Sequence, residues 1–214
     1  MNIRVFTVAL GVVLTAIVSS ASAQKTYTEG VVTSKTSMGG NAVEGKKYFS
    51  ADSTAMTYST GPAAIKILST ANFSFFAVLV DVPTASMKKA AIANPAEIKA
   101  IIVAWPKFTF AAGTETRQIS GFNCKKVVAT DTKTNKAYDV WITNDVAVAP
   151  SAVAPYYAGI GGFPIQFISF GGDGQQSDVT VTGIAETKAP AGTFGIAADF
   201  DKITMDDLKA MSGR

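Results

Sequence analysis

The sequence predicts an α+β protein built on a strongly curved antiparallel β-sheet with helices packed on its concave side. About ten short segments rich in Val, Thr and aromatic residues predict strands, whereas helical patterns are confined to the middle and the end of the chain. Segment 73–81 is apolar at nearly every position, which is typical of a strand covered on both faces. A β-sandwich is the alternative architecture, in which the central helix would be a peripheral addition.

The chain begins with the features of an export signal. Arg4 supplies a short basic region, Val5–Val18 is an almost unbroken apolar run, and Ala21-Ser22-Ala23 has the form of a cleavage site. The apolar run is shorter than the ~20 residues that a membrane-spanning helix needs, and no later segment approaches that length. The sequence therefore predicts a cleaved signal peptide over residues 1–23, a periplasmic or secreted location, and a single domain over 24–214 that is not an integral membrane protein.

The strands of the first half are separated by turn signals. Met38-Gly39-Gly40 and Gly61-Pro62 are the clearest of these turns. The strands are predicted at residues 27–37, 47–51, 54–59, 64–70 and 73–81.

The clearest helical pattern covers residues 94–105. Asn94 can cap the helix, Pro95 suits its first position, and Glu97 can complete a capping box. Four apolar residues then recur at helical spacing and form one stripe: Ile98, Ile101, Ile102 and Trp105. Such a stripe packs against a core more often than it lines a ligand site, and both interpretations stay open.

The remaining elements continue the strand-rich pattern. A shorter helix is predicted around residues 85–91, and Thr204 with Asp207 predicts a capped terminal helix through Met211. Strands are predicted at 114–120, 122–130, 136–144, 163–170 and 177–187.

Composition excludes the commonest catalytic chemistries. The chain has no histidine and one cysteine, Cys124, so a histidine-based triad and an internal disulfide are both excluded. Cys124 is expected to be a small buried hydrophobe. The acidic cluster that includes Asp199 and Asp201 lacks the spacing of a calcium loop. We therefore expect no catalytic residues, no metal, no cofactor and no enzymatic activity.

Charge patterning gives no sign of a nucleic-acid surface. The chain carries 19 basic and 16 acidic residues, with a net charge of +3, and no block of like charge. The pairs Lys46-Lys47, Lys88-Lys89 and Lys125-Lys126 are isolated, and we expect them to be solvated.

A long uncharged segment, residues 146–172, is the most distinctive stretch of the second half. It contains five aromatic residues together with several Gly and Pro residues. Such a loop can cover a cavity, meet a partner, or simply pack on its own core. Trp141 adds to the interest of this region, because strand alternation directs it opposite to Tyr138, Val140 and Ile142.

Two neighbouring strands carry a resemblance to a known family. Gly121-Phe122-Asn123-Cys124-Lys125-Lys126, Val140-Trp141-Ile142-Thr143 and the later Phe163-Pro164 resemble a family of exported bacterial proteins, domain of unknown function 4412. The family is similar in architecture to the periplasmic lipoprotein carriers, whose fold is an open half-barrel with helices lining its concavity. The resemblance implies a periplasmic or cell-surface protein that carries an apolar ligand, and it implies no catalytic residue.

We therefore expect an exported protein that binds or carries an apolar ligand, such as a lipid or an acyl chain, between sheet and helices. The alternative is a structural or interaction module that docks on another envelope protein through residues 146–172. The expected ligand contacts are Ile98, Ile102, Trp105, Phe108, Trp141, Tyr156, Tyr157 and Phe163.

Overall fold

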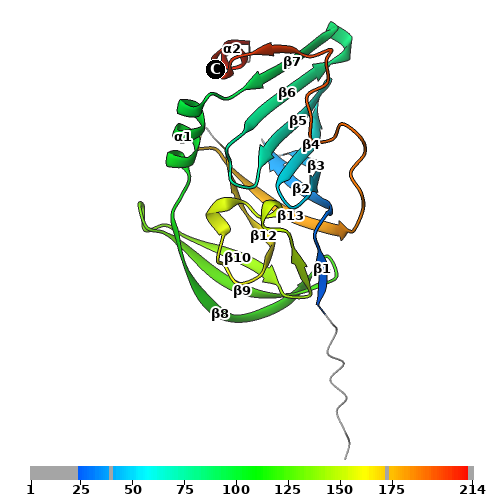
Figure 1. The fold of residues 1–214 in the computed structure, drawn as a ribbon. Helices are drawn as coiled ribbons and strands as arrows, with labels where there is room; N and C mark the ends of the chain where they lie inside the picture. Colours follow the sequence, from blue (N-terminus) through cyan, green and yellow to red (C-terminus); the bar gives the residue numbers. More distant parts are fainter. Residues whose placement is uncertain (1–23, 39–40, 172–173, 212–214) are drawn as a thin grey trace, which may run out of the picture.

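A computed structural model describes residues 24–38, 41–171 and 174–211 (Figure 1). Twelve strands form one sheet in the order β14-β7-β6-β5-β4-β3-β2-β13-β12-β10-β9-β8, and β1 pairs with β11 in a second, two-stranded sheet. The strands are β1 (Lys25–Tyr27), β2 (Gly30–Met38), β3 (Asn41–Phe49), β4 (Ser53–Thr60), β5 (Ala63–Thr70), β6 (Phe76–Val82), β7 (Met87–Ile92), β8 (Phe108–Ile119), β9 (Phe122–Asp131), β10 (Ala137–Thr143), β11 (Val146–Val148), β12 (Phe163–Phe170), β13 (Gln176–Ala185) and β14 (Asp201–Ile203). The helices are α1 (Pro95–Ala104) and α2 (Met205–Met211), with 3₁₀ turns η1 (Pro83–Ala85), η2 (Pro150–Ala152) and η3 (Pro155–Tyr157).

The large sheet consists of two sequential halves that meet at one strand pair. Strands β2 to β7 follow one another along the chain and across the sheet, and β8, β9, β10, β12 and β13 make the other half. The halves join where β13 pairs antiparallel with β2. Only β14, paired with β7, is parallel to its neighbour in this sheet. The prediction of a large antiparallel sheet with few helices is confirmed.

The buried residues form three clusters on this sheet. In the first half, Ala55, Leu68 and Leu79 lie beneath Phe194 and Phe200 of the C-terminal segment. The other two clusters lie on opposite faces of β10. One contains Trp141 and extends to Val32 and Phe49 of the first half, and the other contains Val140 and Ile142. The opposite orientation expected for Trp141 is confirmed, and Cys124 is buried beside it, as expected.

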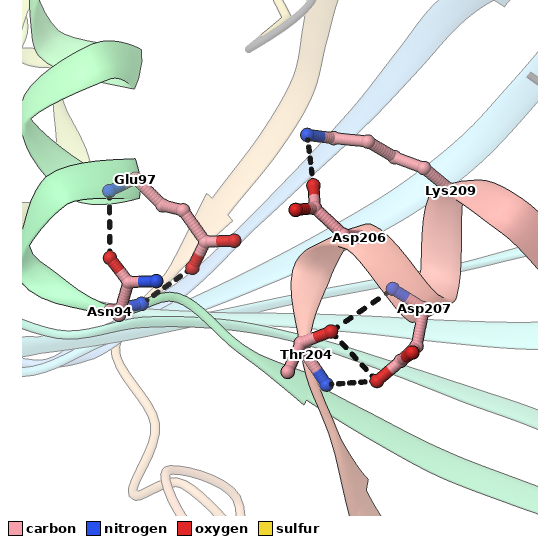
Figure 2. A network of polar contacts seen from close by, with 6 residues as sticks. All are labelled: Asn94, Glu97, Thr204, Asp206, Asp207 and Lys209. Atoms are coloured by element: carbon pink, nitrogen blue, oxygen red, sulfur yellow. Dashed lines mark hydrogen bonds and ion pairs between the residues drawn. The ribbon is translucent and has the colours of Figure 1, made fainter.

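Both helices begin with the predicted capping box (Figure 2). Asn94 Oδ1 accepts hydrogen bonds from the N–H groups of Ala96 and Glu97, and the Glu97 carboxylate accepts one from the Asn94 N–H. In α2, Asp207 N donates to Thr204 Oγ1 and Thr204 N donates to Asp207 Oδ2. These reciprocal bonds satisfy backbone donors that a helix start leaves free.

The apolar stripe of α1 is not part of a core. No residue of α1 is buried: Ile98, Ile101 and the capping Trp105 are partly buried, whereas Ile102 is 44% exposed and Val103, outside the stripe, is 63% exposed. Large exposed apolar side chains on a helix are unusual, because their burial normally supplies most of a short helix's stability.

The helix predicted around 85–91 is wrong. Residues Met87–Ile92 form β7, which pairs with β6 and with β14. Ala90 and Ala91 point to opposite faces of this strand and both are fully buried. Small side chains suit a strand enclosed on both faces, and this packing overrides the helical propensity of alanine.

The predicted signal peptide lies outside the described residues. Among the residues that are described, no helix is long and apolar enough to cross a membrane.

Candidate functional site

One face of the first half-sheet is apolar and only partly covered. The register from β3 to β7 is unbroken, so residues directly opposite one another share a face. The central row of this face runs from Lys47 through Met56, Ile67 and Val78. We name it the Met56 face, and its members are Lys47, Phe49, Thr54, Met56, Tyr58, Ile65, Ile67, Phe76, Val78 and Val80.

The two faces of these strands differ in burial. On the opposite face Ala55, Leu68 and Ala77 are almost fully buried under the C-terminal segment. On the Met56 face Phe49 and Thr54 are buried, and the other members are only partly buried. Segment 73–81, expected to be covered on both faces, is therefore closely covered on one face only. A contiguous set of partly exposed apolar side chains is typical of a binding surface.

Lys47 is the one charged member of the Met56 face within β3 to β6. It lies opposite Val32 of β2 on one side and Met56 of β4 on the other. Its Nζ donates a hydrogen bond of 3.0 Å to the carbonyl oxygen of Ala152 in η2. Burial lowers the pKa of Lys47 from 10.5 to about 8, because the charged ammonium is partly removed from water.

The Lys46-Lys47 pair was expected to be solvated, and this holds for only one of the two. Lys46 is exposed on the opposite face, whereas Lys47 points into the Met56 face. Successive residues of a strand point to opposite faces, so adjacent lysines need not share an environment.

A chain of aromatic rings runs from the Met56 face into the second half of the protein. Phe76 contacts Phe73 with ring centroids 5.3 Å apart, and Phe73 contacts Trp105 at 4.6 Å. Trp105, which caps the C-terminus of α1, contacts Tyr156 at 5.7 Å. The aromatic chain then continues through Tyr157, Phe108 and Phe170.

The two tyrosines of η3 use their hydroxyl groups inside the protein. Tyr157 Oη donates to the Ile168 carbonyl oxygen at 2.8 Å, and Tyr156 Oη accepts from the Phe170 N–H at 3.0 Å. Burial raises the pKa of both phenols. These bonds fix residues 155–157 against β12, so this part of the uncharged segment has a defined position.

The segment 150–157 joins the aromatic chain to the Met56 face. Its 3₁₀ turn η2 packs on β3 and β4, and Ser151 Oγ donates to the Ser50 carbonyl oxygen. Lys47 bonds the same turn. Figure 1 shows this segment in yellow between the two halves of the sheet. The Met56 face is thus bounded by η2 at β3 and β4 and by the Phe73–Trp105 contact near β6.

The eight expected ligand contacts divide into three environments. Trp105, Phe108, Tyr156 and Tyr157 meet in the aromatic chain. Trp141 and Phe163 are 8% and 5% exposed and belong to a separate buried cluster, where the Arg117 guanidinium covers the Trp141 ring at 3.9 Å. Ile98 is partly buried, and Ile102 is exposed. The structure thus brings together the four members of the aromatic chain in one place and Trp141 with Phe163 in another.

No direct signal in the sequence marks Met56, Ile67 and Val78 as members of a binding surface. These residues alternate with polar or buried neighbours like those of any sheet strand. Only the strand order and the placement of residues 194–200 reveal which face stays partly open. The sequence signal that could have located this face is Lys47. It alternates with Phe49 along the strand, so a charged side chain shares a face with a large apolar one.

Two surface hollows lie largely outside the Met56 face, although Tyr58 and Ile65 of that face line part of the first. One, of about 580 Å³, is lined largely by the opposite face of β3 to β6, including Glu44, Lys46, Lys66 and Asp81. The other, of about 460 Å³, lies beside Arg117 and Asp145. None of the eight expected contacts lines either hollow.

The acidic side chains near the C-terminus make ion pairs. Asp199 lies 2.7 Å from Lys88 Nζ, and Asp201 lies 2.8 Å from Lys89 Nζ. No cluster of three or more potential metal-ligating His, Cys, Asp or Glu residues occurs in the part of the chain that the structure describes.

Comparison with known proteins gives a likeness of fold. Two crystal structures of PNGF-II, in space groups C2 and P21, match with a TM-score of 0.50 each, at 16% and 17% identity. The matches cover 87% and 86% of this chain but 33% of PNGF-II, so the chain spans a third of that protein's length. No protein-family model and no curated protein matches the chain. The resemblance to domain of unknown function 4412 therefore stays a prediction.

Proposed function

We propose that this protein is an exported, non-catalytic binder or carrier of an apolar ligand, such as a lipid or an acyl chain, held against the Met56 face. In this proposal the signal peptide directs the chain to the periplasm or the exterior, and residues 24–214 act as one domain. The observation that carries the proposal is the set of partly exposed Met56, Ile65, Ile67, Phe76, Val78 and Val80 side chains on one face.

The driving force follows from the apolar character of that face. Each methylene group removed from water contributes about 0.8 kcal/mol, and the apolar side chains that it covers lose water as well. A flexible acyl chain can follow the row from Met56 to Val78 without any directional bond. Binding of this kind needs no catalytic group, which is consistent with the absence of histidine.

We further propose that the sheet curves into an open half-barrel with the Met56 face on its concave side. The support is the segment 146–160, which contacts both halves of the sheet. Its turn η2 packs on β3 and β4, and its residues Val146, Ala149 and Ala152 share a cluster with Trp141 of β10. Val32, Val181 and Ile165, from the strands β2, β13 and β12 that lie between β3 and β10, belong to the same cluster, as expected where one segment packs along the inner face of a curved sheet.

The burial of the aromatic side chains favours this function over docking on a partner protein. Tyr157 and Phe163 are buried, and Tyr156, Phe167 and Phe170 are partly buried. The hydroxyl groups of Tyr156 and Tyr157 also take part in hydrogen bonds with β12, which favours packing of this segment on its own protein.

Quenching of tryptophan fluorescence by brominated acyl chains tests the proposal. The chain has two tryptophans, so Trp141→Phe leaves Trp105 as the only reporter and Trp105→Phe leaves Trp141. Trp105 contacts Phe73 beside the Met56 face, whereas Trp141 is buried under Arg117. We expect saturable quenching of Trp105 and little quenching of Trp141.

As a control, quenching of each single-tryptophan variant by acrylamide in the absence of ligand measures how accessible each indole is to solvent. Equal quenching of both tryptophans by the brominated chain, or none at any soluble concentration, would contradict the proposed site.

A further inference from the structure

We propose that the ligand is a single-chain amphiphile with an anionic head, a long-chain carboxylate, whose head group pairs with Lys47 while its tail covers the Met56 face. This inference rests on the proposed function and adds the chemical class of the ligand.

The surroundings of Lys47 carry the inference. A lysine ammonium has three donors, and the described contacts of Lys47 use one of them, toward Ala152 O. Among the described residues no carboxylate lies within salt-bridge distance of its Nζ. By contrast, Lys88, Lys89 and Lys126 each pair with an aspartate or glutamate.

The positive charge of Lys47 is therefore not balanced by a carboxylate of the described residues. Its neighbours across the strands are Val32 and Met56, and its neighbours along the same face of β3 are Gly45 and Phe49. The charged groups on β3 next to it, Lys46 and Glu44, point to the opposite face. An ammonium held in such surroundings is costly without a partner, and a carboxylate supplies both the charge and the hydrogen-bond acceptors. The lowered pKa of Lys47 agrees with this imbalance.

The tail has an apolar path that begins at the same lysine. Strands lie about 4.8 Å apart, so the row from Lys47 across Met56 and Ile67 to Val78 spans roughly 14 Å. An extended dodecyl chain has a comparable length. One tail fits this row from the one charged residue at its end, and we therefore infer a ligand with a single chain.

Three ligands of equal chain length test the inference near pH 7: dodecanoate and dodecyltrimethylammonium, titrated below their micellar concentrations, and dodecanol, titrated below its solubility limit. A hydrogen bond to a charged group contributes about 1.5 kcal/mol or more, so we expect dodecanoate to bind at least about tenfold more tightly than dodecanol. The cation should bind most weakly. Lys47→Met should bring dodecanoate to the affinity of dodecanol, and Lys46→Met should leave the preference unchanged.

A pH series on the natural chain provides a second readout that needs no variant. The preference for dodecanoate over dodecanol should fall on going from pH 7 to about pH 10, because Lys47 in the free protein loses its proton near pH 8. Tyr58 of β4 is the other titratable group on the adjoining strand faces, and burial raises its pKa above its usual value of 10.0. The strand β2 and the turn η2 present Val32 and Ala152 to Lys47, and neither side chain titrates.

The outcomes separate this inference from the proposed function. Equal affinity of the natural chain for the three ligands overturns the anionic head and leaves the apolar site intact. A preference for dodecanoate that persists in Lys47→Met overturns the role of Lys47. Binding of none of the three overturns the proposed function and this inference with it.

Discussion

At the residue scale, Lys47 is the feature that sequence patterning and structure describe most differently. An ammonium beside an exposed lysine is ordinarily solvated, yet alternation along β3 turns this one toward Val32 and Met56. Its folded-state pKa of about 8 lies below the unfolded value near 10.5. Below pH 8 both states carry the proton, and the charged form makes the folded state less stable by up to about 3 kcal/mol.

This balance predicts how stability changes with pH. Between pH 8 and 10.5 the unfolded chain binds more protons at Lys47 than the folded chain does, so the free energy of unfolding gains a contribution that rises with pH. Lys47→Met removes this contribution. Urea unfolding near pH 7 and near pH 10 should therefore show the natural chain gaining stability relative to Lys47→Met.

Lys46→Met is the matched control, and it should follow the pH dependence of the natural chain. Parallel pH profiles for the natural chain and Lys47→Met would contradict the buried position of the ammonium.

At the scale of elements, the stability of α1 depends on interactions at its two ends more than on packing of its sides. None of its residues is buried, so its stability rests on the Asn94–Glu97 capping box, on Pro95 and on the packing of Trp105. Figure 1 shows the helix beside the sheet where the chain crosses from β7 to β8.

Replacing the cap should loosen α1 alone. Asn94→Ala removes the acceptor for two backbone N–H groups, which costs about 1 kcal/mol, and this corresponds to roughly fivefold faster amide exchange in the helix. Exchange in β4 to β6 should not change. Asn94→Asp keeps an acceptor and should keep the slow exchange, whereas faster exchange throughout the sheet would show that α1 is part of the main cooperative unit.

The elements were largely predictable from the sequence, and the exceptions have physical reasons. Caps and alternation are local signals, so the helix starting at Pro95 and the strands β4, β9 and β12 lie close to their predicted bounds. Segment 85–91 has helix-forming composition, but its partners β6 and β14 are distant in the sequence. Local patterning cannot show such partners.

At the scale of the whole molecule, the two halves of the sheet depend on the strand β2. Gly30 lies at the start of β2, where a Cβ atom would come within 2.5 Å of the Ala185 carbonyl oxygen and 3.0 Å of the Phe49 ring. The close approach joins β2, β3 and β13, which carry the connection between the halves.

Substitution at this junction should destabilise the protein as a unit. Gly30→Ala should lower the free energy of unfolding by about 1–3 kcal/mol, because neighbouring backbone must shift to admit the methyl group. Gly183→Ala, on β13 at the same junction, has open space around its Cβ position and should cost far less. Similar losses for the two variants in thermal or urea unfolding would contradict the close packing at Gly30.

The candidate site was only partly predictable for the same reason. Aromatic residues of the uncharged segment indicated a functional region, and four of the eight expected contacts do meet in the aromatic chain. Trp141 and Phe163 pack inside the protein instead. Which strand face stays open depends on where residues 194–200 lie, and that placement is a long-range property.

Methionine methyl NMR tests the central claim, that the Met56 face binds an apolar chain. The methyl group of Met56 lies in the central row of that face, whereas Met205 and Met211 lie in α2. With ¹³C-methyl methionine and an assignment from Met56→Leu, titration with dodecanoate should shift the Met56 signal saturably and leave those of Met205 and Met211 in place. An unmoved Met56 signal at saturating dodecanoate, or equal shifts at all three methionines, would contradict the account.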